Sequence, residues 1–160
     1  MMDFQERLQR AVNRGERSRS AKQREAEAQA LSEEECRRLH SDYRLKLNEH
    51  IEKCIAQLGD QFPGFRFENV MSDRGWGAAC SRDDVGAGGG RRDNFFSRLE
   101  MVVRPVGKYP VLELTAKGTI RNKEVYNRQR YQQLDEVDLE SFNELVELWV
   151  LEYAELYASS

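Results

Sequence analysis

The sequence predicts an α+β fold in which a long N-terminal helix precedes an antiparallel meander of four or five strands, and a C-terminal amphipathic helix packs on the sheet. Apolar residues recur at helical spacing before residue 59 and after residue 138, whereas between residues 65 and 131 they alternate with polar residues, as in strands. At 160 residues, the chain can bury one core of ordinary size. We therefore expect a polar, helical extension over residues 1–31 and a single α+β domain over residues 32–160.

The N-terminal helical region has a candidate break. Ser32 and Glu35 match a capping box, which predicts that a second helix begins there. A continuous helix from about Ser20 to Leu58 is the alternative, because a serine inside a helix can simply face solvent. Gly59 is the expected C-cap. The first apolar residues at helical spacing are Phe4, Leu8, Ala11 and Val12, and the later stripe consists of Leu39, Tyr43, Leu47, Ile51, Cys54, Ile55 and Leu58.

The sheet is predicted to begin with the alternating pattern of residues 65–70. Ser72 to Gly75 is a plausible turn, and residues 76–81 form a short returning strand. Residues 83–93 contain four glycines in the five positions 86–90. Because glycine loses the most backbone entropy on ordering, we expect a flexible loop over this stretch.

The second half of the sheet is predicted from two clear alternations. Residues 95–104 fit a half-buried central strand, and residues 111–117 place Leu112, Leu114 and Ala116 on one face. Lys117-Gly118 suggests a tight hairpin into a last strand over residues 120–131. Asp138 is the expected N-cap of the final helix. Its apolar residues are Phe142, Leu145, Val146, Trp149, Tyr153 and Leu156.

The charges, cysteines and apolar stretches of the chain limit the functions that it can have. A net charge of −3 gives no overall attraction to nucleic acid or anionic lipid. However, residues 117–130 carry five basic side chains and one acidic one, whereas residues 133–160 carry eight acidic side chains and no basic one. Three cysteines without a C-x-x-C spacing favour reduced thiols. With no apolar stretch long enough to span a membrane and no secretory signal, we expect a cytoplasmic protein.

Two cysteines and both histidines form a symmetric pattern, Cys36-x-x-x-His40 and His50-x-x-x-Cys54, within about 40° of one helical line. Two such helices crossing antiparallel near Leu45 would offer two thiolates and two imidazoles to zinc. Packing of these residues in the core is the favoured interpretation, so we predict no metal and retain the four as secondary candidates.

Nucleic-acid binding is the main alternative function. Aromatic and arginine side chains interleaved on a strand can stack bases and contact phosphates. The acidic final helix and the lack of an RNA-binding signature argue against it. The residues that would carry this function are Arg121, Tyr126, Arg128, Arg130 and Tyr131, together with the basic run Arg14, Arg17, Arg19, Lys22 and Arg24.

Catalysis and cofactor binding receive little support. The glycines at 86–90 followed by Arg91 and Arg92 lack the Lys-Ser/Thr ending of a P-loop and the spacing of a dinucleotide fingerprint. Both histidines share one helix face, which leaves no base for a nucleophile elsewhere. Cys80, the one thiol outside that helix, fits a buried strand residue better than a reactive one. We therefore predict no enzymatic activity and no cofactor.

These observations favour a non-catalytic intracellular protein-interaction module that forms a homodimer through its N-terminal helices, or binds another protein through them. RNA or single-stranded DNA binding by the basic last strand and the N-terminal arm is the alternative. A weaker third hypothesis is a small-ligand pocket between the sheet and its helices, lined by Phe95, Met101, Trp149 and Tyr153.

Overall fold

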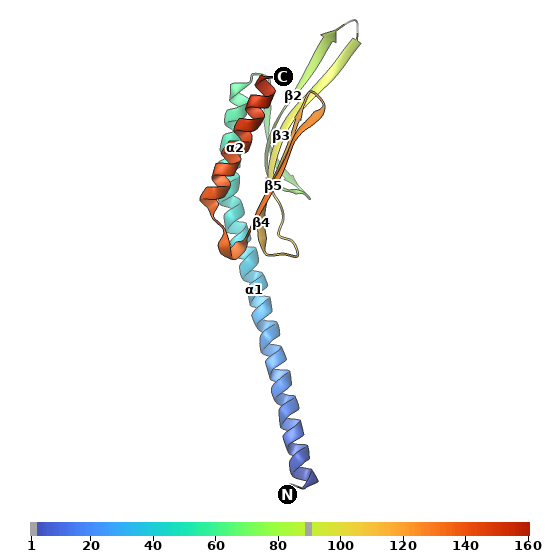
Figure 1. Cartoon of the computed structure of the whole chain (residues 1–160), viewed down its shortest axis with the longest axis vertical. Coiled ribbons are helices and arrows are strands. Elements are labelled where there is room, and N and C mark those ends of the chain that lie inside the picture. The colour runs from blue at the N-terminus through green and yellow to red at the C-terminus, as the bar shows by residue number, and fades with distance from the viewer. Residues whose placement is uncertain (1–2, 89–90) are drawn as a thin grey trace. The chain divides into compact units, whose positions relative to one another are not determined.

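The computed structural model describes residues 3–88 and 91–160, and it confirms the predicted α+β fold (Figure 1). A long N-terminal helix is followed by a five-stranded antiparallel sheet and a C-terminal helix. Neighbouring strands follow the chain order β1-β2-β3-β4-β5. The elements are α1 (Phe4–Gln61), β1 (Arg66–Ser72), β2 (Gly75–Gly88), β3 (Arg91–Val103), β4 (Val111–Ile120), β5 (Lys123–Gln133), the 3-10 helix η1 (Leu134–Glu136) and α2 (Leu139–Ala158).

The chain divides into two compact units, Met1–Arg38 and Leu39–Ser160. The predicted boundary between residues 31 and 32 lies within α1 (Phe4–Gln61). No new helix begins at Ser32, because α1 is a single helix that contributes to both units. Ser32 is exposed, so its hydroxyl can face solvent without breaking the helix. Of the two alternatives that the sequence leaves open, the structure has the continuous helix.

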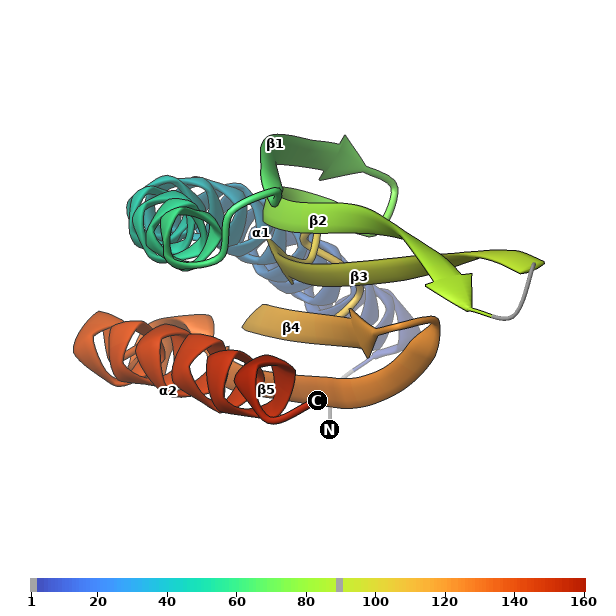
Figure 2. The same ribbon diagram turned by 90° about the horizontal axis from the view of Figure 1, so that it is seen from above.

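The core of the second unit lies between the sheet and two helices that cover one of its faces (Figure 2). Leu99 and Met101 of β3 and Leu112 and Leu114 of β4 are fully buried on that face. Burial alternates along β4 as predicted, whereas residues 99–103 of β3 are buried on both faces of the sheet. The helices contribute Leu47, Ile51, Ile55 and Leu58 from α1 and Phe142, Val146, Trp149 and Tyr153 from α2.

Within this unit, α1 and α2 lie side by side and run in the same direction (Figures 1 and 2). His50 of α1 is beside Glu147 of α2. Further along, Phe62 packs edge-on against Tyr157 with ring centroids 4.9 Å apart, and Phe65 packs on the same ring at 5.0 Å. The three aromatic rings therefore close the end of the core where both helices terminate.

The hairpin between β4 and β5 lies further along the chain than predicted. Lys117 and Gly118 are inside β4, and the turn is formed by Arg121 and Asn122, whose φ angles are 48° and 70°. Gly118 is required for packing instead, because a Cβ there would lie 2.9 Å from Cδ2 of Tyr153. Gly118 therefore makes room for an aromatic ring, and the predicted turn at this glycine is wrong.

The glycine-rich stretch also differs from the predicted loop. Residues 83–88 belong to β2 and pair with residues 91–96 of β3 in an antiparallel ladder, with Gly86 opposite Asp93 and Gly88 opposite Arg91. Main-chain hydrogen bonds make such a ladder, so it does not depend on side chains. Residues 89 and 90 of the predicted loop lie outside the described residues.

Two predicted boundaries are confirmed. The turn after β1 spans Asp73 and Arg74, since β1 ends at Ser72 and β2 begins at Gly75. Asp138 caps α2, where its Oδ1 accepts a hydrogen bond from the amide of Ser141 at 3.3 Å. Such a cap satisfies one of the orphan amides of the first helical turn.

Candidate functional site

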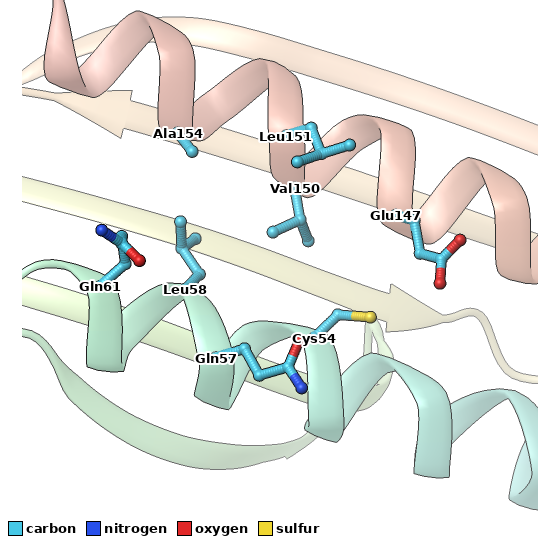
Figure 3. A pocket seen from close by; sticks show the side chains of 8 residues that line it. All are labelled: Cys54, Gln57, Leu58, Gln61, Glu147, Val150, Leu151 and Ala154. Atoms are coloured by element: carbon cyan, nitrogen blue, oxygen red, sulfur yellow. The ribbon is translucent and has the colours of Figure 1, made fainter.

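A groove lies between α1 and α2 on the side of the helices away from the sheet core (Figure 3). Its volume is about 380 Å³. The walls are largely apolar because small and aliphatic side chains line much of their length. The lining residues are Cys54, Gln57, Leu58 and Gln61 from α1 and Glu147, Val150, Leu151 and Ala154 from α2.

Three potential metal ligands converge at one end of this groove. His50 and Cys54 are one helical turn apart on α1, and Glu147 projects from α2. The His50 Nε2 atom lies 3.6 Å from Sγ of Cys54 and 3.3 Å from Oε1 of Glu147. All three ligand atoms are within 4.8 Å of one another. The cluster thus brings one nitrogen, one sulfur and one oxygen donor together.

The environment of the cluster keeps the Cys54 thiol protonated. Burial raises the pKa of this thiol, and the neighbouring Glu147 carboxylate raises it further, while Lys53 acts weakly in the opposite direction. A Cys-His-acid catalytic triad also needs the acid on the second ring nitrogen, Nδ1. Here the thiol and the carboxylate both approach Nε2, so the arrangement does not fit nucleophilic catalysis.

The structure separates the four residues of the predicted metal pattern. His40 is buried, and its Nε2 lies 3.0 Å from the carbonyl oxygen of Arg104. Since a carbonyl oxygen can only accept, Nε2 carries the proton and His40 is used for packing. Burial also lowers the pKa of His40. Cys36 belongs to the first unit, so only His50 and Cys54 are brought together in the second.

Sequence reasoning missed Glu147. It is separated from Cys54 by the whole sheet, and it is one of eight acidic residues after residue 133. No local spacing singles it out. Only the pairing of α1 with α2, which depends on long-range packing, identifies it.

The remaining cysteine is also unsuited to a reactive role. Cys80 is fully buried in β2, beneath the helices. Burial raises the pKa of its thiol to about 11, which leaves almost no thiolate at neutral pH. The structure thus favours the packing interpretation of Cys80.

The residues predicted for nucleic-acid binding do not share one surface. Tyr126 is buried, its hydroxyl donates to Glu152 of α2, and Arg128 covers its ring at 4.6 Å. Tyr131 is 59% exposed, but an odd residue separation from Tyr126 and Arg128 places it on the opposite face of β5. Arg121 is in the β4–β5 turn. Base stacking on Tyr126 is therefore blocked.

The sheet face opposite the helices carries a charge network around Glu100. This carboxylate is only 7% exposed. Its oxygens lie 3.3 Å from Arg98 and 3.7 Å from Arg74, and Arg98 also pairs with Glu68. Two guanidinium groups thus compensate the buried charge. A shallow depression of about 190 Å³ beside it is lined by Arg74, Glu100, Val102, Arg104, Thr115, Lys117, Asn127 and Gln129.

The first unit presents a different kind of surface. Every side chain that the structure describes between residues 3 and 35 is exposed. These include Phe4, Leu8 and Val12, which are 75%, 51% and 46% exposed. Their spacing puts them on one side of the helix. The segment therefore carries an apolar stripe that nothing in its own unit covers.

Comparisons with protein-family models, with curated proteins and with solved structures gave no significant match. In the part of the chain that the structure describes, no helix is both long and apolar enough to cross a membrane. The sites above are therefore assigned from the geometry and chemistry of the chain's own residues.

Proposed function

We propose that this chain is a cytoplasmic, non-catalytic protein-interaction module that forms an antiparallel homodimer through the N-terminal part of α1. The observation that carries the proposal is that every described side chain of residues 3–35 is exposed, while basic and acidic side chains are sorted into separate stretches of this segment. Helices in proteins owe most of their stability to packing of an apolar face, and this segment has no such packing within its unit. The three free thiols fit a reducing compartment.

Charge along the segment favours a second copy as the partner. Residues 7–24, which we call the basic block, carry seven basic side chains and one acidic one. Residues 25–35, the acidic block, carry five acidic side chains and no basic one. An antiparallel pair with its dyad near Gln23 places each basic block opposite the partner's acidic block. A parallel pair would instead set like charges side by side, which is unfavourable.

A row of arginines within the basic block also favours a second copy of the chain as the partner. Arg7, Arg10, Arg14 and Arg17 are spaced by three, four and three residues, so they line one side of the helix. Within residues 3–27, whose side chains the structure describes, none of these guanidinium groups forms an ion pair. Like charges at this spacing destabilise a helix by about 0.2–0.5 kcal/mol per pair. The acidic block of a partner would relieve that repulsion.

Spin-label distances on the full-length chain test both association and direction. Single nitroxides are attached through Ala11→Cys or Gln23→Cys in a Cys36→Ser background, in which the remaining cysteines are buried. Two labels at position 11 should be separated by about 36 Å along an antiparallel pair, because 24 residues at 1.5 Å each lie between them. Labels at position 23 should be close. Short distances at both positions would overturn the antiparallel arrangement, and a monomer in native mass spectrometry would overturn self-association.

Charge reversal supplies the matched control. Changing Arg7, Arg10, Arg14 and Arg17 to Glu should abolish the dimer, and changing Glu25, Glu27 and Glu33 to Lys should weaken it. An equimolar mixture of the two variants should restore a heterodimer, which shows that both chains are folded. A basic-block variant that still dimerises fully would contradict the proposed role of charge.

RNA or single-stranded DNA binding is a second candidate, favoured by the same exposed arginine row and by Arg128 and Arg130 on β5. Covered Tyr126 and the acidic α2 weigh against it. Fluorescence anisotropy with a labelled single-stranded RNA separates the candidates. Affinity that falls steeply with salt and is lost on replacing Arg128 and Arg130 would favour nucleic-acid binding over self-association.

A further inference from the structure

We propose that His50, Cys54 and Glu147 bind one zinc ion, with the fourth coordination position open toward the groove between α1 and α2. This site is separate from the proposed dimer surface, because all three residues belong to the second unit. It also differs from the predicted pattern, since one chain supplies all three ligands and neither Cys36 nor His40 takes part. Zinc commonly takes nitrogen, sulfur and carboxylate donors in such sites.

The distances in the cluster match the edges of a zinc tetrahedron. With Zn–N, Zn–S and Zn–O distances of about 2.0–2.3 Å, tetrahedral angles give nitrogen–oxygen edges of about 3.3 Å and nitrogen–sulfur edges of about 3.6 Å. The observed distances from His50 Nε2 to Glu147 and to Cys54 are 3.3 Å and 3.6 Å. The sulfur–oxygen distance is within 4.8 Å. Rotation of the exposed Glu147 side chain can bring this edge to the required length of about 3.5 Å.

Hydrogen bonding alone does not satisfy this arrangement. His50 Nε2 carries either one proton or one lone pair, so it cannot both accept the Cys54 S–H and donate to Glu147. In either tautomer, therefore, only one of these two short contacts can be a hydrogen bond. A cation at the centre removes the conflict, because the imidazole nitrogen, the thiolate and the carboxylate all donate electron pairs to it.

The charge and proton balance are also favourable. Zinc carries two positive charges, and the thiolate and carboxylate together carry two negative ones, so the bound site is neutral overall. Binding displaces the thiol proton of Cys54 to solvent, while the imidazole nitrogen of His50 and the carboxylate of Glu147 donate electron pairs to the ion. One proton is released for each zinc bound.

Two rigid elements hold the ligands. His50 and Cys54, separated by four residues, project from the same side of α1, and Glu147 comes from the neighbouring helix. A bound ion would therefore cross-link α1 to α2. Cys54 and Glu147 also line the groove, so the fourth position is accessible to water or a small anionic ligand from that side (Figure 3).

Cobalt substitution tests the site in the full-length chain. After treatment with a chelator, the protein is titrated with Co²⁺ and then with Zn²⁺. We expect one Co²⁺ to bind per chain. Its absorption spectrum should show a near-ultraviolet thiolate-to-cobalt charge-transfer band and visible bands as intense as those of tetrahedral Co²⁺. Adding zinc should remove all of these bands. Absence of the charge-transfer band, or binding without defined stoichiometry, would overturn the proposal.

Matched variants locate the ion. Cys54→Ser and His50→Gln should weaken zinc binding by about 100-fold or more, since even the hydrogen-bond partners of metal ligands contribute 10–100-fold. Glu147→Gln should weaken it at least tenfold. Cys36→Ser and Glu144→Gln, which change the same residue types outside the cluster, should leave affinity unchanged. Circular dichroism verifies folding, and at one fixed zinc concentration the rise in melting temperature should be largest in the wild type and in these two controls. Zinc affinity equal to that of the wild type in the folded Cys54→Ser or Glu147→Gln variant would contradict this ligand set.

Discussion

His40 and His50 are on the same helix, yet their surroundings give them different chemistry. His40 is 4% exposed and donates to the Arg104 carbonyl, at the end of β3. His50 is half-buried and meets Cys54 and Glu147. The His40 imidazole is committed to a hydrogen bond with the Arg104 carbonyl. The His50 imidazole faces Glu147 of α2 and remains accessible to a ligand. Both residues are histidines with a cysteine four positions away on α1, so only the groups that contact them distinguish the two.

Burial of His40 makes stability depend on pH. Because burial lowers the pKa of His40 in the folded state, the unfolded chain binds more protons just below the ordinary histidine pKa of about 6.5. The contribution of neutral His40 is therefore complete above that pH and is lost as the pH falls toward the folded-state value. In urea unfolding from pH 8 to pH 5, His40→Gln should show a shallower loss of unfolding free energy than the wild type. Parallel curves for the two proteins would contradict this assignment.

The sequence could predict only part of the cluster of His50, Cys54 and Glu147. The spacing of His50 and Cys54 places them one turn apart on the same side of α1, where their side chains meet. Their common partner Glu147 could not be identified, because a contact between α1 and α2 depends on the whole sheet between them. Spacing reports local geometry, but not which helix will pack alongside.

At the scale of elements, periodic patterns predicted most of the fold. Alternation over residues 95–104 and 111–117 gave β3 and β4 with the correct inward faces, and Asp138 marked the start of α2. The errors lie where glycine or serine was read as a local signal. Gly118 packs under Tyr153, and Ser32 faces solvent inside α1. The role of Gly118 depends on the packing of Tyr153, and that of Ser32 on its exposure to solvent; neither can be inferred from the neighbouring sequence.

The β4–β5 hairpin depends on the Asn122 side chain. Its Oδ1 accepts from the amide of Phe96 at 2.9 Å, and its Nδ2 donates to the carbonyl of Asn94 at 2.8 Å. Asn122→Ala should therefore lower the unfolding free energy by about 2 kcal/mol, at about 1 kcal/mol per hydrogen bond. Arg121→Ala is the matched control, because that residue also has positive φ and bonds to Ser97 only through its backbone. We expect it to change stability by about 0.5 kcal/mol or less. If the two variants lose equal stability in thermal unfolding, the backbone conformation of the turn, and not the side-chain amide of Asn122, stabilises the hairpin.

At the scale of the whole molecule, stability and the proposed association reside in different units. Among the residues whose burial the structure describes, those of the core belong to Leu39–Ser160. A chain lacking residues 1–31 should therefore unfold cooperatively, with an unfolding free energy close to that of the full-length monomer. It should sediment as a monomer in analytical ultracentrifugation. A truncated chain that still dimerises would contradict the proposed function.

The same truncation separates the two proposals. Zinc binding should be unchanged in the shortened chain, because His50, Cys54 and Glu147 are all retained. Loss of the dimer with retention of zinc is the expected pattern. Loss of zinc binding together with the dimer would instead indicate that the metal site is formed only in the associated protein, against the single-chain ligand set.

The parallel direction of α1 and α2 follows from the number of strands between them. Five antiparallel strands, an odd number, return the chain to the end of the sheet where the second unit begins, so α2 starts beside the same end of α1. An evolutionary change that adds or removes a hairpin alters the count by two and keeps this direction. Gain or loss of a single strand would reverse α2 and carry Glu147 away from Cys54. Homologous lineages that retain the cluster should therefore vary in length by whole hairpins or by loops, and not by single strands.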